Sequence, residues 1–392
     1  MFTFSRLFLL GGVLASLPLR AVYAPIPEQE QGKNLTFAFK LGAAHDTNLF
    51  AAASRPVGSW IWTAAPRVTY NGSLTDQTFL SAGYGLTLDR FDNRPGDKLL
   101  DSHDATVRVA HAFTKSTTID LTESINVARN PEALLSGVPL NPDQSYTRNQ
   151  LDGRFNTPLG PKAELLVKAR SVYYRYRDAA LGRSLDRFEN LYGASADYAV
   201  LPETKVVGEY RRLEVFYDKL GETKNKRSNY LMGGLDYAVA RKLSLSTRVG
   251  AEWRKRVGER SATSPYAEAS AKFDYTKESF VVAGAGYAFE ETSDTARFND
   301  TKVRRAFASV QHHLTALIVA SGSVNYEPAT LQGRRGVASV AEKTLRVGGA
   351  LSYLPTKNWV ISASYDHDRV SSLDAQRKLR RERGGISGTY SF

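Results

Sequence analysis

Polar and apolar residues alternate along most of the chain, from residue 34 onward. In Leu243–Arg254 the odd positions carry Leu, Thr, Val, Ala and Trp, whereas the even positions carry Ser, Arg, Gly and Glu. Pro265–Tyr275 repeats the pattern, with Ala, Phe and Tyr on one face and Glu, Ser, Lys and Asp on the other. Because successive side chains of a strand point to opposite faces, this alternation predicts β-strands that have one apolar and one polar face.

Segments of this kind follow one another to the end of the chain, and we expect about 18 of them. They lie near residues 34–43, 59–73, 78–91, 102–114, 118–130, 147–157, 163–177, 188–200, 205–218, 228–239, 243–257, 264–276, 280–292, 302–314, 317–328, 343–354, 359–370 and 384–392. Short connections alternate with longer ones such as 131–146, 219–227 and 371–383. This pattern is typical of membrane barrels, which have short turns at one end and long loops at the other. We therefore predict an all-β fold, a transmembrane antiparallel β-barrel over residues 34–392 with both ends of the chain at the periplasmic side.

Aromatic residues recur where the expected strands reach the short turns. Eight of nine such strands carry one with apolar-face parity, namely Tyr70, Phe113, Phe155, Tyr198, Tyr237, Tyr275, Tyr353 and Tyr390. The remaining strand has His312 and His313 there. Aromatic girdles mark the membrane interfaces of barrels, so this recurrence favours a barrel over a soluble β-sandwich or propeller.

The first residues are typical of an export signal. Arg6 precedes an apolar run, Leu7–Leu17, which has the length of a signal-peptide core and is too short to span a bilayer. Small residues follow, and cleavage is expected after Ala21 or Ala24. We therefore expect a cleaved signal peptide over residues 1–24, a short periplasmic segment over 25–33, and a location in the bacterial outer membrane.

The last residues are typical of an assembly signal for such barrels. Tyr390 and Phe392 share one face of the final expected strand. A terminal Phe with an aromatic residue two positions earlier resembles the signal read by the bacterial barrel-assembly machinery. The expected partners are this machinery, outer-membrane lipid and lipopolysaccharide, and no nucleic acid.

Composition excludes several kinds of chemistry. The chain has 392 residues and no Cys, which excludes a disulfide framework, a thiol nucleophile and a Cys-ligated metal. No Gly-x-Ser-x-Gly, His-Glu-x-x-His or phosphate-loop motif occurs. We therefore expect no enzyme, no metal and no cofactor, and a barrel enzyme built from distant strands is the least favoured alternative.

Charges of both signs fall at the polar, inward positions of the expected strands. The pore-lining candidates are Lys168, Arg170, Arg248, Glu252, Arg254, Arg256, Glu268, Lys272, Asp274, Arg346 and Asp366. Several cations on one wall bias the passage of ions, so Arg248, Arg254 and Arg256 are the main candidates for selectivity. The alternative is that such charges merely solvate a water-filled wall. Opposite charges are also expected to pair across neighbouring strands and narrow the bore.

The excess of positive charge, formally +12, lies largely in the expected long loops. The segment 371–383 is predicted to be an extracellular basic loop with Arg377, Lys378, Arg380, Arg381 and Arg383. Two roles are open for it: contact with lipopolysaccharide phosphates, or guidance of an acidic polymer. The loop 131–146 contains apolar residues and is expected either to fold inward as a constriction or to lie on the surface.

The segment Gly42–Phe50, with Asp46 and Asn48, resembles the first strand and loop of outer-membrane β-barrel porins encoded beside exopolysaccharide biosynthesis genes in Gram-negative bacteria. Trp60 or Trp62, followed by Pro66, is similar in the next strand. The resemblance is diffuse over the rest of the chain and transfers no functional residue. It implies a terminal exit conduit for a secreted exopolysaccharide, working with periplasmic and inner-membrane export components. The alternative function is a general or solute-selective diffusion porin.

Overall fold

The computed structural model describes residues 34–129, 145–239, 242–292, 297–334 and 336–392. The expected signal peptide, the segment 25–33 and most of the loop 131–146 lie outside these residues, and their predicted roles stay predictions.

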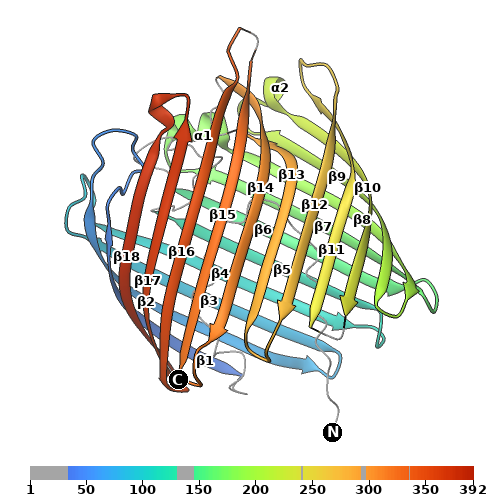
Figure 1. Ribbon diagram of the computed structural model, residues 1–392, viewed down its shortest axis with the longest axis horizontal. Helices are drawn as coiled ribbons and strands as arrows, with labels where there is room; N and C mark the ends of the chain where they lie inside the picture. The colour runs from blue at the N-terminus through green and yellow to red at the C-terminus, as the bar shows by residue number, and fades with distance from the viewer. Residues whose placement is uncertain (1–33, 130–144, 240–241, 293–296, 335) are drawn as a thin grey trace.

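Eighteen antiparallel strands form one sheet that closes on itself (Figure 1). The strands are β1 Leu35–Asp46, β2 Ser59–Thr75, β3 Thr78–Phe91, β4 Leu99–Ala112, β5 Thr118–Ala128, β6 Tyr146–Pro158, β7 Ala163–Tyr176, β8 Arg187–Leu201, β9 Thr204–Tyr217, β10 Lys226–Val239, β11 Leu243–Arg256, β12 Ala262–Asp274, β13 Phe280–Glu291, β14 Phe298–His313, β15 Ile318–Gly333, β16 Val340–Thr356, β17 Trp359–Ser372 and β18 Leu379–Ser391. Each strand pairs with its neighbours in sequence, and β1 also pairs with β18. The predicted barrel of about 18 strands is confirmed.

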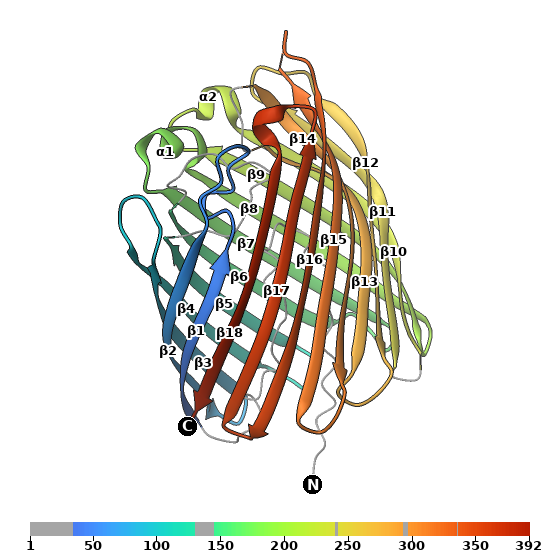
Figure 2. The same cartoon turned by 60° about the vertical axis from the view of Figure 1, so that its left-hand side comes forward.

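The two ends of the barrel differ as the sequence predicts. Tight turns join the strands at the end where the C-terminus lies (Figures 1 and 2). The longer connections at the other end contain the short helices α1 Ala179–Leu185 and α2 Gly221–Lys224 and the 3-10 turn η2 Ala375–Arg377. None of the helices in the described part of the chain is long and apolar enough to cross a membrane.

The outer face of the barrel carries exposed apolar side chains. Leu231, Val249 and Leu351 are each at least half exposed and point outward. The strand registers place six of the eight predicted girdle aromatics on this same face, and Phe113 and Tyr275 follow the ends of β4 and β12 with the same parity. On β14, whose end lacks an aromatic residue, the imidazole Nδ1 of His312 lies 2.9 Å from the hydroxyl of Tyr275. A histidine thus completes the girdle by bonding to its aromatic neighbour.

The seam between β1 and β18 is fixed at both ends. At the short-turn end, Phe37 and Phe392 exchange two backbone hydrogen bonds, of 3.0 and 2.8 Å, and their rings stack with centroids 5.6 Å apart. At the other end, the buried carboxylate of Asp46 accepts a bond from Arg381 Nε at 2.9 Å. Asn48 is also buried, and its amide nitrogen donates to the carbonyls of Ala52 and Arg380. The Asp-x-Asn stretch therefore holds the first long loop onto the last strand.

The predicted basic loop over 371–383 is wrong in its extent. Strand β18 begins at Leu379, so Arg380, Arg381 and Arg383 belong to a strand rather than to a loop. Arg377 does lie in the connection, but it is buried and bonds to Glu342, leaving Lys378 as the exposed cation there. The error has a physical cause. The residues of β18 that follow Leu379 are polar on both faces of the strand, so the alternation of apolar and polar residues that predicts a strand is absent there.

A single introduced arginine can test which residues of β16 face outward. Val347→Arg places a cation on the outer face between Tyr353 and Lys343, whereas Ala350→Arg places it on the inner face. A cation on the lipid face near the membrane centre costs about 2–4 kcal/mol, so the free energy of unfolding in lipid vesicles should fall by this amount for Val347→Arg. The Ala350→Arg barrel should stay within about 1 kcal/mol of the parent, and equal losses would contradict the assignment of faces.

The closing aromatic stack yields a second prediction. Phe392→Ala removes the ring that stacks on both Phe37 and Tyr390, and it removes the expected recognition signal. The amount of folded barrel in outer membranes, measured by its faster migration on gels before heating, should fall several-fold. Tyr353→Ala is the matched control, because it deletes a girdle aromatic away from the seam. Equal folded amounts for the two variants would show that the terminal aromatic has no special role.

Candidate permeation pathway

The inner face of the barrel is lined by charged and polar side chains. The strand registers place all eleven predicted pore-lining residues on this face: Lys168, Arg170, Arg248, Glu252, Arg254, Arg256, Glu268, Lys272, Asp274, Arg346 and Asp366. Most of those charges meet an opposite charge rather than open water. Arg170 bonds to Asp152 at 2.6 Å, and Lys272 bonds to Asp274 at 2.8 Å.

A network of ion pairs crosses six strands of the inner wall, from β7 to β12. Glu209 is its centre: its carboxylate lies 2.7 Å from Arg211, 3.4 Å from Arg248 and 3.7 Å from Lys168. Arg211 continues to Glu268 at 3.0 Å, and Arg248 to Asp236 at 2.7 Å. Since Arg248 and Glu209 are both buried, the network acts as a fixed lattice of paired charges along the wall.

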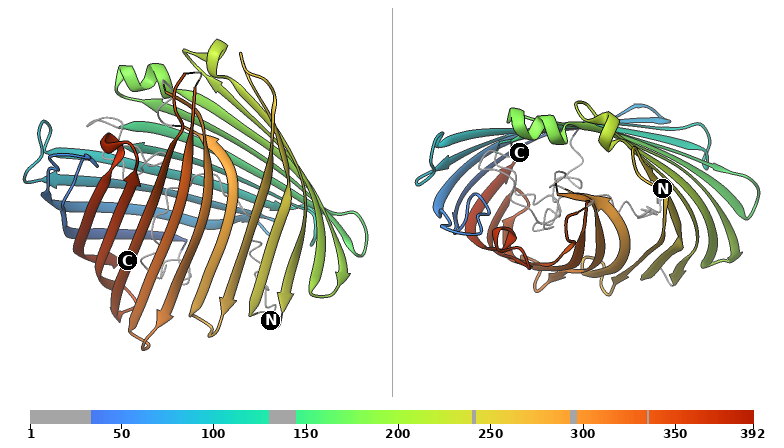
Figure 3. Two further views of the ribbon diagram at one scale, coloured as in Figure 1. Left: turned by 45° about the horizontal axis from the view of Figure 1, so that its top comes forward. Right: turned by 90° about the horizontal axis from the view of Figure 1, so that it is seen from above.

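Strands β13 and β14 leave the wall at the long-loop end. The pairing between β12 and β13 stops at Ala267 and Tyr287, whereas β13 and β14 stay paired up to Glu291 and Asp300. Beyond Tyr287 this hairpin turns into the barrel, as the view from above shows (Figure 3). Its outward-parity residues therefore face the inner wall of β10 and β11 instead of lipid.

Buried ion pairs hold the hairpin against that wall. The carboxylate of Glu291 pairs with Lys226 and lies 3.2 Å from Arg256, and it accepts a 2.7 Å bond from the hydroxyl of Tyr217. Asp300, on the other strand of the hairpin, lies 3.0 Å from Arg256 and 3.4 Å from Arg254. Three cations on the wall thus meet two acids on the hairpin.

Apolar and aromatic contacts lie beside these ion pairs. The guanidinium of Arg254 lies over the ring of Phe289, 4.4 Å from its centroid. Ala288 packs against a buried cluster of Tyr230, Met232 and Tyr266 on the inner wall. The hairpin is therefore fixed by packing as well as by charge, and it narrows the lumen.

The structure gives the predicted selectivity residues a different setting from the one expected. Arg254 and Arg256 bond to the hairpin, and Arg248 belongs to the network around Glu209. Glu252 is buried and accepts bonds from the hydroxyls of Ser228, at 2.6 Å, and Ser264, at 3.4 Å. Alternation identifies the inward face but not the acids that fold onto it, so Glu291 and Asp300 were not among the sequence candidates.

Ion pairs and hydrogen bonds also brace the rim of the long-loop end. The ammonium of Lys224, in α2, donates a 2.9 Å bond to the carbonyl of Ser184 in α1 and lies over the ring of Tyr217. Burial lowers the pKa of Lys224 to about 8. Asp374 accepts a 2.8 Å bond from Arg297, which lowers the pKa of this carboxyl. The first contact connects the β7–β8 and β9–β10 loops, and the second connects the β13–β14 and β17–β18 loops.

Comparison with known proteins identifies the fold. No protein-family model and no curated protein matches the chain, so the resemblance to exopolysaccharide-associated porins stays a prediction. Among solved structures, OccK5 (OpdH) of Pseudomonas aeruginosa is similar, with a TM-score of 0.50 and 8% identity over 91% of this chain and 98% of that chain. The outer membrane protein OpdK of the same organism has a TM-score of 0.48 and 11% identity over 91% and 99%. The chain is a closed barrel of the bacterial outer membrane.

The contacts of Glu291 predict what holds the hairpin in place. Glu291→Gln keeps an acceptor for Tyr217 but leaves the buried Lys226 and Arg256 without this carboxylate. Removing one partner of a buried pair costs about 3–5 kcal/mol, so the hairpin should detach more often. Single-channel recordings in planar bilayers should show larger and noisier currents.

The control for this change is Asp274→Asn. It breaks the pair with Lys272 near the short turns, and it lies at the opposite end of β12 from Ala267, where the hairpin leaves the wall. Its current noise should equal that of the parent. If Glu291→Gln leaves both conductance and noise unchanged, the hairpin is not held by these charges.

Proposed function

We propose that the protein is a diffusion channel for small polar solutes across the outer membrane. An 18-stranded ring leaves room for an aqueous lumen, and the inner wall here is polar along its length. The observation that carries the proposal is the hairpin of β13 and β14, held inside the lumen by Glu291 and Asp300. A tethered constriction in a wide barrel admits small molecules and restricts large ones.

Export of an exopolysaccharide, implied by the family resemblance, is the less supported function. A polymer in transit needs a bore that is wide over its whole length, and the hairpin narrows this one. The residues that carry the resemblance also have another task, since Asp46 and Asn48 bond to Arg381 and to the backbone at the β1–β18 seam. These contacts explain why Asp46 and Asn48 are present, because both residues help to close the barrel. A role in binding a polymer is not needed to explain them.

The charges of the lumen favour solutes of mixed character. Cations and anions alternate in the network around Glu209, and cations of the wall meet acids of the hairpin. A wall of paired charges has little net field to repel either sign. The channel should therefore show weak ion selectivity, and it should pass polar molecules that exchange hydrogen bonds with carboxylates and guanidinium groups.

The absence of Cys makes the aqueous path directly testable. Ser323 faces the lumen on β15 and the adjacent Val324 faces outward. A negatively charged, water-soluble thiol reagent should label Ser323→Cys and reduce the current through the channel. Val324→Cys is the matched control and should give no change in current. Block at both positions, or at neither, would contradict a water-filled lumen lined by the inward face.

Solute size separates the two functions. Liposomes that contain the protein should swell in pentoses and hexoses, and the rate should fall steeply for trisaccharides and larger sugars. Deletion of the protein in its bacterium should slow uptake of small solutes and leave surface polysaccharide intact. Loss of polysaccharide with normal uptake would instead support the export conduit.

A further inference from the structure

Outward-facing side chains on β16, β17 and β18 change abruptly from apolar to basic. Along β17 the outward positions are Trp359, Ile361, Ala363 and Tyr365, followed by His367 and Arg369. On β18 they run upward from Tyr390 and Ile386 to Glu382 and Arg380, and on β16 from Tyr353 and Val347 to Lys343. Arg369 and Arg380 are register partners, and Lys343 pairs with Ser371, two residues beyond Arg369, so the boundary lies at a similar level on three neighbouring strands.

The height of this boundary matches the thickness of the membrane. Arg369 lies ten positions beyond Trp359, which stacks with Tyr390 in the aromatic girdle. At roughly 3.3 Å per residue and a tilt of about 40°, ten residues rise about 25 Å, the usual height of the apolar band of such barrels. The basic residues thus lie at the level of the outer-leaflet head groups.

Two of these cations face each other directly. Arg369 and Arg380 are register partners on adjacent strands, and both side chains are exposed on the outer face. Like charges in directly opposite positions destabilise a strand pair unless an anion compensates them. Glu382 does so in part, because its carboxylate lies 2.7 Å from Arg380 and 3.7 Å from His367. The charge of Arg369 is not balanced by this acid.

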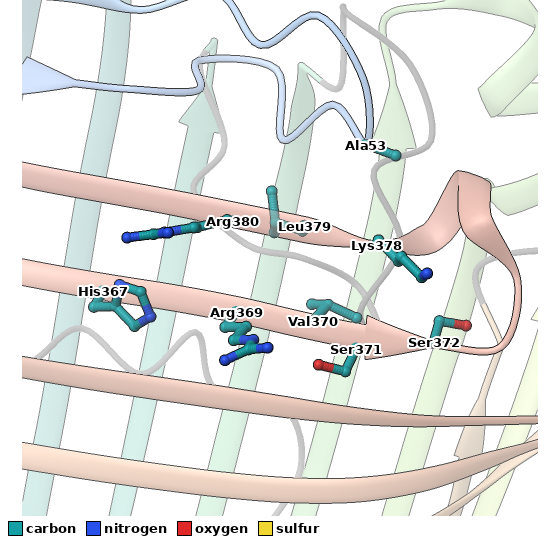
Figure 4. A pocket seen from close by; sticks show the side chains of 9 residues that line it. All are labelled: Ala53, His367, Arg369, Val370, Ser371, Ser372, Lys378, Leu379 and Arg380. Carbon is teal, nitrogen blue, oxygen red and sulfur yellow. The ribbon is translucent and has the colours of Figure 1, made fainter.

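A hollow of about 740 Å³ lies at the same place. Its lining includes His367, Arg369, Lys378 and Arg380, which Figure 4 shows on β17, on β18 and at the turn between them. Ser371 adds a hydroxyl to this lining. The site therefore combines a cavity, three permanent cations and a position at the edge of the apolar band.

We propose that this hollow binds a phosphate group of lipopolysaccharide in the outer leaflet. Guanidinium groups present parallel N–H donors that match a phosphate. Arg380 donates from Nε and Nη2 to Glu382, so the phosphate would meet the fork of Arg369 and the other edge of Arg380. The acyl chains of the same lipid would lie along the apolar outward stripes of β16, β17 and β18. This site is on the outer face, so it is independent of the solute channel proposed above.

The test uses the purified barrel in detergent with defined lipid A. Bis-phosphorylated lipid A should bind to the parent, and Arg369→Gln combined with Arg380→Gln should weaken binding at least tenfold, measured by native mass spectrometry. Arg90→Gln is the matched control, because Arg90 is an exposed outward arginine whose register partners are Trp62 and Leu99 rather than a cation. All variants are first checked for the heat-dependent gel shift of a folded barrel, which shows that lost binding is not lost folding.

Two further ligands identify what is recognised. Dephosphorylated lipid A should bind at least tenfold more weakly than the bis-phosphorylated form, and inorganic phosphate should compete only at much higher concentration. The proposal fails if the double variant binds like the parent, or if removing the phosphates has no effect. Competition by inorganic phosphate at the concentration of the lipid would also overturn it, since the site would then hold free phosphate rather than a lipid.

Discussion

Closure of the sheet is the constraint on which the rest of the structure depends. Inside a bilayer no water is present to bond an exposed N–H or C=O group, so a strand that crosses it needs a neighbour on each side. The last strand therefore has to find the first, and Phe37 and Phe392 complete that contact with reciprocal backbone bonds. Once the ring is closed, the surface that meets lipid has to be largely apolar, and charged side chains such as Arg170, Arg248 and Lys272 are directed inward.

The many charged side chains that face the lumen are a second constraint on the fold, because some of them are buried. Cations and acids of the lumen that are removed from water lose solvation free energy, and they are stable there only when opposite charges and hydrogen bonds replace it. The lattice around Glu209 does this within the wall. For Lys226, Arg254 and Arg256 the acids come from the hairpin of β13 and β14, which folds in to meet them. The same ion pairs therefore neutralise the cations of this part of the wall and hold the hairpin in the lumen as a constriction.

Much of this architecture could be predicted from the sequence, because contact with lipid imposes a strict alternation on every strand it touches. That rule predicted the number of strands, the two faces and the aromatic girdle. It fails where lipid ends: at the start of β18, Arg380 and Arg381 point to opposite faces although both are charged. It fails also for the hairpin, since Glu291 and Asp300 have outward parity and only their contacts with Arg256 show that this part of the sheet has turned inward. Alternation predicts which residues share a face of a strand, but it does not predict whether that face contacts lipid, water or another part of the barrel.

The departure of β13 from β12 has a mechanical consequence. Their ladder, from Ala267 paired with Tyr287 to Asp274 paired with Phe280, joins eight residue pairs, compared with twelve between β11 and β12. A pull on the hairpin from outside would load the uppermost pair first, so the bonds would break one after another, as in peeling. The boundary between β12 and β13 has the shortest ladder among the described strand pairs, and it is therefore where the wall would be expected to open first under load.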